Sequence, residues 1–500
     1  MAPYFIRNLL PRRQARDANR RPLGPLLRSL TLIQWAQFLT GWLAWTCDAI
    51  DFFNVALSVT RLQKQFNKPD ASSIVLDSKP QTTAITLTLL VRSIGAVLFG
   101  VLSDRYGRKW PLVANLLLCS TVQLGTSFVQ TFQQFLAVRS LFGIAMGGVW
   151  GLASSTALEN LPVEARGLAS GVLQQGYAVG YLISAIMSLY LVPNNPHTWR
   201  ALFWATSAIS AFAATIRALV PESEVFLRAK AQERAFGANP GKRTKVFIRQ
   251  IGAMLKQHWA LCVYAILLMA GFNFLSHGSQ DLYPTYLKTS KGFDNYHAIV
   301  ATIIGNCGAI TGGAIAGSVS QYIGRRLTII SFVLLSGVFI PLWILPSGFS
   351  GLAAGAFCVQ FGVQGAWGVI PIQLAEMSPP GFRATFPGVA YQLGNMISSA
   401  SAQIEAIGGN HLKTTINKNG KATVVPDYAT VQGILLGAIA TFVIFITIIG
   451  PENHGSNFEN ETTAFEQRKV LDKVRLSELG GIDKVPRPID TRSEEINDKF

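Results

Sequence analysis

The chain has 500 residues, of which 49% are hydrophobic and only 14% are charged. Soluble proteins carry about 25% charged residues, so this composition argues against the two soluble domains that the length alone would suggest. Apolar runs of about 20 residues recur along the chain, and each can cross the roughly 30 Å hydrocarbon core of a bilayer. The formal net charge of +16 does not require a nucleic-acid partner, because the basic residues cluster beside these runs and in the C-terminal tail.

The apolar runs predict an all-α integral membrane protein with twelve transmembrane helices in two six-helix pseudo-repeats. The first six spans cover roughly 31–58, 82–103, 110–130, 133–157, 167–191 and 199–220. The second six cover roughly 259–287, 297–318, 327–346, 350–375, 383–407 and 429–450. This division predicts an N-terminal segment at 1–30, six-helix bundles at 31–220 and 259–450, a linker at 221–258, and a disordered mixed-charge tail at 451–500.

Basic residues predict the orientation in the membrane. Seven arginines precede Leu30, and eight Lys and Arg residues lie in 221–258. The positive-inside rule therefore predicts that both termini are cytoplasmic. Residues 1–29 hold no apolar core, so we expect no cleavable signal peptide. The five cysteines all lie inside apolar runs without a C-x-x-C pair, which indicates neither a disulfide framework nor a metal site.

The second half of the chain repeats the first. Residues 100–109 read GVLSDRYGRK and residues 317–326 read GSVSQYIGRR, an offset of 217 residues. The same offset relates Glu159, Pro162, Arg166 and Gly171 to Glu376, Pro379, Arg383 and Gly388. A repeat that keeps its register over two separate motifs indicates duplication, with the halves related by an axis along the membrane normal.

A polar stretch from Asn273 to Thr285 interrupts the seventh apolar run. At about 100° per residue, five of its side chains fall within roughly 140° of one helix face; they are Asn273, Ser276, His277, Gln280 and Asp281. Pro284 should end or bend this helix. Such a face forms either a polar seam between packed helices or the wall of a water-filled substrate path. We favour the path, because buried polar groups are costly in hydrocarbon.

Two arginines lie well inside predicted spans, Arg92 near the middle of span 2 and Arg139 in span 4. A guanidinium at this depth should face a cavity, and its fork suits a carboxylate bidentately. We favour Arg92 as the substrate anchor and expect Arg139 to make a helix-to-helix bond.

Proton coupling requires a group whose protonation depends on what binds nearby. His277 titrates near neutrality when unperturbed, and Asp281 lies one turn away on the same face. Asp48 and Asp51 lie one turn apart on span 1, the mate of span 7. These four residues are the candidates for proton coupling. Glu405 lies near the outer end of span 11, where it could equally well reach water.

The loop after span 2 predicts a cytoplasmic closure. Gly100 allows close helix contact, and Asp104 can face the positive end of a helix or a basic group. We expect inner-side bridges between Glu159 and Arg166 and between Glu376 and Arg383. The gating or structural set is Gly100, Asp104, Arg105, Gly107, Arg108, Arg139, Glu159, Arg166, Glu376 and Arg383. These residues could also be topology anchors without a switching role.

These motifs resemble known families. The sequence at 100–109 resembles the signature loop of the major facilitator superfamily, and Arg139 to Gly143 resembles its span-4 arginine motif. Residues 273–285 match N-x-x-[ST]-H-x-[ST]-Q-D-x-x-x-T, the signature of fungal Jen-type carboxylate/proton symporters of the sialate:proton symporter family. In the second-half loop, Gln321 and Tyr322 replace Asp104 and Arg105, so that loop lacks the acid of a charged latch.

The resemblance implies uptake of lactate and pyruvate, or of succinate and malate, with protons across the plasma membrane. The expected substrate-binding residues are Arg92, Asn273, Ser276, His277, Gln280 and Thr285. The expected partners are small carboxylate anions, protons and membrane lipid, for a monomer with no cofactor other than the coupling proton.

Other classes of protein compete with this hypothesis. A sugar porter would favour neutral amides and aromatic rings over Arg92 and His277, whereas a phosphate porter would also use the cation. An intramembrane enzyme is disfavoured, because H-E-x-x-H, G-x-S-x-G and paired Cys/His ligands are all missing from the sequence. A transporter-like receptor without flux remains compatible with the sequence.

Overall fold

The structure is a computed structural model that describes residues 22–66, 79–192, 197, 199–235, 249, 251–379, 382–418, 421–452 and 454. Most of the predicted N-terminal segment, much of the linker and nearly all of the tail lie outside the described residues. The predicted boundaries and the disordered tail therefore stay predictions.

The first half consists of helices whose bounds follow the predicted spans. They are α2 (Leu23–Arg28), α3 (Leu32–Phe66), α4 (Lys79–Tyr106), α5 (Lys109–Thr126), α6 (Phe132–Met146), α7 (Val149–Leu158), α8 (Arg166–Gln174), α9 (Gly176–Tyr190) and α10 (Trp199–Leu219), followed by α11 (Glu224–Ala235).

The second half repeats this order. Its elements are α13 (Trp259–Gln280), α14 (Tyr283–Thr289), α15 (Asn295–Ile323), α16 (Arg325–Val338), α17 (Ile340–Ile344), α18 (Phe349–Met377), α19 (Thr385–Ser398), α20 (Ser401–His411), β1 (Lys413–Lys418), β2 (Lys421–Pro426) and α21 (Tyr428–Ile449).

Five crossings are each built from two consecutive helices, so the described helices group into the twelve predicted spans. Pro284 and Pro341 lie in the first turns of α14 and α17, where a missing N–H is tolerated and the preceding helix must stop. Gly147 and Gly148 separate α6 from α7. By length and composition, eight of the crossings qualify as membrane spans; α3, α5, α16 with α17, and α19 with α20 complete the two sets of six.

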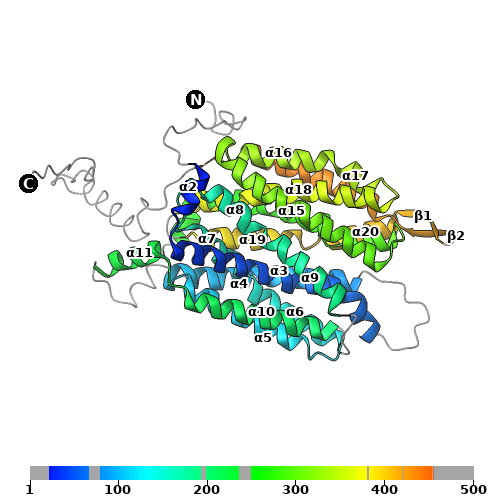
Figure 1. Ribbon diagram of the computed structural model, residues 1–500, viewed down its shortest axis with the longest axis horizontal. Helices are drawn as coiled ribbons and strands as arrows, with labels where there is room; N and C mark the ends of the chain where they lie inside the picture. The colour runs from blue at the N-terminus through cyan, green and yellow to red at the C-terminus, as the bar shows by residue number, and fades with distance from the viewer. Residues whose placement is uncertain are drawn as a thin grey trace, which may run out of the picture.

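The helices run side by side along the long axis of the molecule (Figure 1). Helices α2 and α11 lie at one end, called here the α11 end, and the strands lie at the other, the hairpin end. The antiparallel pairing of β1 and β2 brings Lys418 opposite Lys421. The Asn419-Gly420 pair between them is a strong hairpin turn signal, which explains strands in a long loop of an otherwise helical chain.

Glycines allow the two halves to pack closely. A Cβ on Gly317 of α15 would lie 2.8 Å from the Cα of Gly171 in α8. A Cβ on Gly151 of α7 would lie 2.9 Å from the Cα of Gly388 in α19. Real Cβ atoms do not approach so closely, so these positions require glycine and hold the helices of one half against the other.

Candidate functional site

Arg92 lies in a buried ion pair between the first two crossings. Its Nη2 atom is 3.1 Å from Oδ2 of Asp48 on α3, and the Arg92 side chain is only 2% exposed. The Nε atom of Arg92 and the Oδ1 atom of Asp48 are buried without a hydrogen-bond partner. The pair is therefore held by a single hydrogen bond, and both groups keep a free position for another partner.

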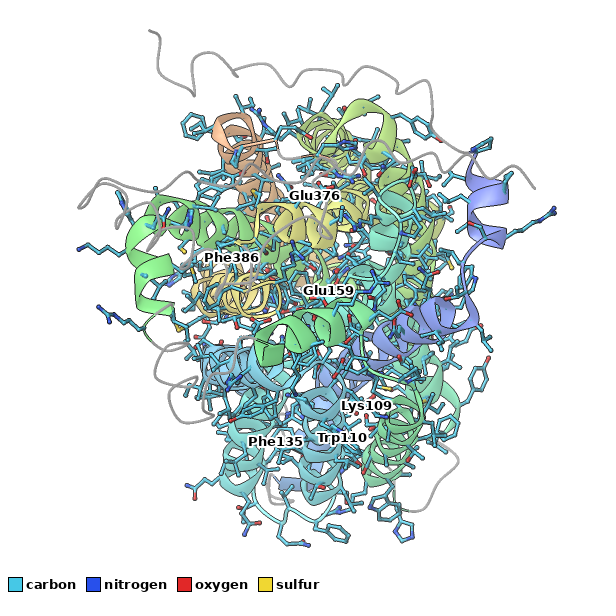
Figure 2. The ribbon with its side chains drawn as sticks, turned by 90° about the vertical axis from the view of Figure 1, so that its left-hand side faces the viewer. Lys109, Trp110, Phe135, Glu159, Glu376 and Phe386 are labelled. Carbon is cyan, nitrogen blue, oxygen red and sulfur yellow. The ribbon has the colours of Figure 1, made fainter. Side chains whose placement is uncertain are left out.

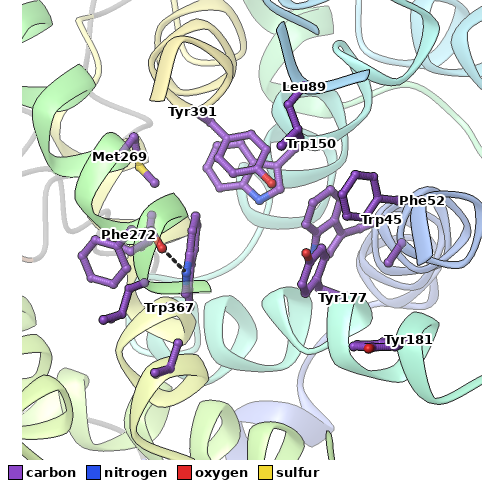
Figure 3. Packing of buried hydrophobic residues seen from close by; sticks show 14 of the residues in the cluster. Trp45, Phe52, Leu89, Trp150, Tyr177, Tyr181, Met269, Phe272, Trp367 and Tyr391 are labelled. Atoms are coloured by element: carbon purple, nitrogen blue, oxygen red, sulfur yellow. Dashed lines mark hydrogen bonds between the residues drawn. The ribbon is translucent and has the colours of Figure 1, made fainter. Parts of the chain in front are cut away.

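Aromatic rings from both halves surround this ion pair. The guanidinium carbon of Arg92 lies 5.8 Å from the ring centroid of Phe52 and 5.9 Å from that of Tyr391, which belongs to α19 of the second half. Figure 3 shows Tyr391 beside Trp150, with ring centroids 4.6 Å apart. The ring centroids of Trp45 and Tyr391 lie 6.1 Å apart, with the ring planes nearly perpendicular. Arg92 thus faces the opposite half of the protein and not the lipid, whereas its predicted place in a cavity stays a prediction.

The polar face of α13 contacts two different helices of its own half. Asn273 donates from Nδ2 to the carbonyl of Tyr391 on α19 at 3.2 Å. Ser276 accepts from Gln364 of α18 at 3.2 Å, and Gln280 donates to Gln360 of α18 at 2.7 Å. In this conformation the face is mainly a polar seam, the alternative that the sequence disfavoured, because the neighbouring helices offer matching amides.

Thr285 is separated from this face. It lies in α14, beyond the break between α13 and α14, and is half-buried. The described contacts of Arg92 and His277 do not include it. The sequence motif therefore spans two helices, and its last position does not share the surface of its first five polar residues.

His277 links an acid on its own helix to an amide on α19. Its Nδ1 atom lies 3.0 Å from Oδ2 of Asp281, and its Nε2 atom lies 3.1 Å from Oδ1 of Asn395. Asn395 in turn donates to Gln392, which donates to the carbonyl of Gly147 in the first half. A protonated imidazole would donate at both nitrogens, to the carboxylate and to the amide oxygen. The arrangement therefore connects Asp281 through His277 to α19 and, through Gln392, to the first half.

A small cavity adjoins the polar seam. It has a volume of about 20 Å³, enough for one water molecule. Polar side chains in its wall include Tyr181 of the first half and Gln280, Thr302, Asn306 and Gln360 of the second. The Oε1 atom of Gln280 is buried without a hydrogen-bond partner. A space large enough for one water molecule thus lies beside α13, but it is far smaller than the predicted path.

The two remaining charged candidates lie deep in the first half. Ser210 of α10 donates to Oδ2 of Asp51 at 2.9 Å. Arg139 donates to Gln123 of α5 at 3.0 Å, and its guanidinium lies 4.0 Å from the ring centroid of Phe142. The Gln123 contact is the helix-to-helix bond expected for Arg139, whereas its role in transport stays a prediction.

Contacts between the halves close the molecule at both ends. At the α11 end, the N–H groups of Ala384 and Thr385, at the start of α19, donate to the two oxygens of Asp104 on α4. Towards the hairpin end, Thr86 of α4 donates to the carbonyl of Ser399 at 2.9 Å. His277 is only 4% exposed. The structure is therefore an occluded conformation in which the central charged groups are shielded from both sides.

Asp104 and the start of α19 form a latch at the α11 end. A Cβ on Gly100 would lie 3.0 Å from the Cα of Thr385, so this glycine lets α4 approach α19. Gly107 has a φ of +113°, which other residues rarely adopt. Arg105 lies 5.7 Å from the ring centroid of Tyr106. These placements agree with a closure built from the first-half loop, although its gating role stays a prediction.

The ion pairs at this end differ from those predicted. Glu159 contacts Arg108 at 2.7 Å, and Glu376 contacts Arg325 at 3.0 Å. Arg166 donates from Nε to the carbonyl of Leu161, and Arg383 lies just before α19. Seen along the axis from the α11 end, both glutamates lie near the centre of the bundle (Figure 2). Helix packing brings the loop arginine of each half to its glutamate, so Glu159 pairs with Arg108 and not with the expected Arg166, whereas the expected bridge between Glu376 and Arg383 stays a prediction.

Two further acids cap helices at the same end. Glu222 accepts from the N–H of Lys109 at 3.0 Å, and Glu452 accepts from the N–H groups of Arg325 and Arg326. Burial raises the pKa of Glu452, and these N–H groups oppose that shift. The sequence carries a Pro-Glu pair at both positions, 221–222 and 451–452, a signal that sequence analysis missed.

Several residues at the centre were not predicted from the sequence. Tyr391 and Asn395 of α19 contact the predicted residues, as do Gln360 and Gln364 of α18, and Gln392 supports Asn395. Uncharged amides and rings give no charge signal in an apolar run. Their spacing of three or four residues along one helix face was the available indication.

Two similar halves, closed around buried charge and joined by a latch, define a membrane transporter of the major facilitator fold and not an enzyme. Residues 25–465 match the family described as sugar (and other) transporter, and the chain belongs to that family. It is 34% identical over 469 residues to the carboxylic acid transporter protein homolog of Saccharomyces cerevisiae, covering 92% of this chain and 74% of that protein. It is 28% identical over 378 residues to a probable 4-methylmuconolactone transporter of Cupriavidus pinatubonensis, covering 75% of this chain and 82% of that protein.

Solved structures share the fold. The proton:xylose symporter XylE bound to 6-bromo-6-deoxy-D-glucose superposes with a TM-score of 0.67 at 17% identity, covering 85% of this chain and 98% of XylE. The human organic anion transporter MFSD10 superposes with a TM-score of 0.63 at 13% identity, covering 83% of this chain and 99% of that protein. These likenesses show the architecture alone.

Proposed function

We propose that this protein is a secondary active transporter that takes up short-chain carboxylates together with protons by alternating access. Lactate and pyruvate are the proposed substrates, with succinate and malate as the longer members of the class. The buried Arg92–Asp48 pair carries the proposal, because it places one cation with a free donor between the two halves. The match to the yeast carboxylic acid transporter homolog supports the substrate class.

The ion pair offers a physical route to proton coupling. A substrate carboxylate can bind the guanidinium fork of Arg92 bidentately and replace Asp48. Asp48 would then be a buried carboxylate without its cation. Binding a proton would remove the free-energy cost of this unpaired charge. Substrate and proton would therefore enter the site together. His277 and Asp281 would share the proton, because they are in direct contact. They would also orient the substrate, because His277 contacts Asn395 of α19.

Alternating access would proceed by breaking one closure at a time. Breaking the Asp104 latch would open the α11 end, and breaking the contact of Thr86 with Ser399 would open the hairpin end. We place the protein in the plasma membrane as a monomer that needs no cofactor besides the coupling proton. The α11 end, with its excess of basic residues, would face the cytoplasm.

This orientation has a direct test. An epitope inserted between Lys418 and Lys421, at the tip of the hairpin, should bind antibody on intact cells. An epitope after Asn239 in the linker should bind only after permeabilisation. Antibody access to the linker epitope in intact cells would reverse the orientation.

The decisive experiment for function is uptake of labelled lactate and succinate into vesicles that contain the purified protein, with and without an imposed pH gradient. Accumulation that requires the inward proton gradient is the expected result. Uptake of phosphate or a sugar in place of carboxylates would support a different porter, and an absence of flux for any solute would support a receptor.

Ring-derived acids are a second candidate class. The relative from Cupriavidus pinatubonensis is described as a 4-methylmuconolactone transporter, and a relative from Acinetobacter baylyi as a cis,cis-muconate transport protein. The rings of Phe52 and Tyr391 beside Arg92 would suit a flat conjugated acid. Competition of muconate and benzoate against labelled lactate would decide between the two classes.

A further inference from the structure

Glu405 is a buried acid that the mechanism above does not use. It lies in α20 and its side chain is 0% exposed, which corrects the expectation that it could reach water. Gln432 of α21 donates to its Oε2 atom at 2.8 Å, and Ser401 lies 3.3 Å from its Oε1 atom. Both partners are neutral, and the described ion pairs of the chain include no cation at this carboxyl group.

The surroundings of Glu405 disfavour a negative charge. Helix α21 carries no Asp, Glu, Lys, Arg or His between its first and last residues. Asp281, the residue directly after α13, is an acid that is held by His277. Helix α4, which also packs on α20, carries Arg92 in its pair with Asp48. Arg92 and His277 are thus already engaged with other acids, and an ionised Glu405 would be a buried charge held only by neutral side chains.

Glu405 also lies against the proposed transport helix. Its Oε1 atom would be 3.7 Å from a Cβ placed on Gly278, the residue next to His277. A side chain on α13 would therefore fill the space between the helix and the acid. Any movement of α13 away from α20 would open this contact and expose the carboxyl group to solvent from the hairpin end.

We propose that Glu405 binds one of the cotransported protons and is protonated in the occluded conformation. A protonated acid can accept from Gln432 with one oxygen and donate to Ser401 with the other, which satisfies both contacts without a counter-ion. This inference rests on the proposed function, since it assigns a proton that the carrier moves. It is separate from the roles of His277, Asp281 and Asp48.

The test compares Glu405→Gln with the wild type in proteoliposomes. Glutamine has the shape and the hydrogen bonds of the protonated acid, so the variant should keep the wild-type melting temperature and exchange labelled lactate across the membrane. The number of protons moved per lactate, measured with an internal pH dye, should fall by one. Glu405→Asp should keep the wild-type ratio.

Glu452→Gln is the matched control, because that acid caps α16 through two N–H groups and should affect stability without changing the proton ratio. A wild-type proton ratio in Glu405→Gln overturns the proposal. So does a lower melting temperature, or a loss of exchange in a natively folded variant, because either result means that the charged form is required. If the wild type carries no carboxylate at all, the proposed function fails, and the melting temperature alone still reports whether Glu405 is neutral.

Discussion

The two halves of this transporter share a scaffold but place their positive charge differently. Among the described residues, Arg92 and Arg139 lie well inside helices of the first half, whereas the buried Arg325 and Arg326 of the second half lie at the start of α16. The second half faces the first half with His277 and amides such as Asn395 and Gln280. Duplication thus preserved the backbone arrangement while the chemistry diverged. We infer that the first half holds the anion and the second half orients it.

The same contrast appears at the α11 end. Arg108 with Glu159 and Arg325 with Glu376 are equivalent pairs, each spanning 51 residues of sequence. Asp104, however, is an acid that accepts from two N–H groups of the opposite half, whereas its counterpart Gln321 is neutral and donates to the carbonyl of Val163. Closure at this end is therefore electrostatically one-sided, with the stronger contact supplied by the first half.

The largest expected effect comes from changing the anchoring cation. Arg92→Lys keeps the charge but removes the guanidinium fork, so we expect a fall of about a hundredfold or more in lactate uptake with normal surface expression. Arg139→Lys is the matched control in the same half and should reduce uptake less. Initial rates in vesicles measure both variants. Wild-type uptake by Arg92→Lys would contradict the inference that the first half holds the anion and the second half orients it.

The second prediction concerns coupling in the second half. Asp281→Asn keeps the shape of the side chain and removes its titration, so it should retain lactate exchange but lose accumulation driven by a pH gradient. Both activities can be measured in the same vesicle preparation. If Asp281→Asn still concentrates lactate, then coupling does not depend on Asp281, and Asp48 or Asp51 of the first half becomes the first candidate.

The third prediction addresses the one-sided closure. Asp104→Asn should lower the ratio of closed to open molecules at the α11 end by about tenfold, because charge-assisted contacts to a helix start contribute about 1–2 kcal/mol. Spin labels at the exposed Trp110 and Tyr322, in a cysteine-free background, would report the separation of the halves. Gln321→Asn is the control and should change the distribution much less. Equal effects of the two substitutions would show that the closure is symmetric.

The smallest expected effect concerns substrate orientation. Asn273→Ala removes one neutral hydrogen bond to Tyr391, so the KM for lactate should rise by about threefold while transport stays proton-driven. Kinetics at two values of the imposed pH gradient would separate affinity from coupling. A loss of proton dependence in this variant would contradict the separate roles of Asn273 and Asp281.

Helix termini and repeats were predictable from local sequence. Pro284 was expected to end its helix, and the structure shows α13 ending at Gln280 and α14 beginning at Tyr283. The duplicated loops were recognised from their offset of 217 residues, and they occupy equivalent places. Local steric rules and periodicity decide such features, since each depends on residues close together in the chain.

The occluded conformation was not predictable in this way. The polar face of α13 was expected to line a water-filled path, yet most of its side chains meet amides on α18 and α19. Sequence periodicity identifies the side chains on a face but gives no information on what lies opposite. A transporter exchanges that opposing surface during its cycle, so the same face can line a path in another conformation.

The sequence by itself determined the class of protein, the membrane spans, the duplication, and the short set of charged residues that hydrocarbon would not accept unpaired. Only the tertiary structure decided their partners. Arg92 meets Asp48 across 44 residues, His277 meets Asn395 across 118, and Glu159 meets Arg108 in place of the predicted Arg166. Burial cost depends on residue type alone and can be read along the chain, whereas pairing depends on how distant helices pack.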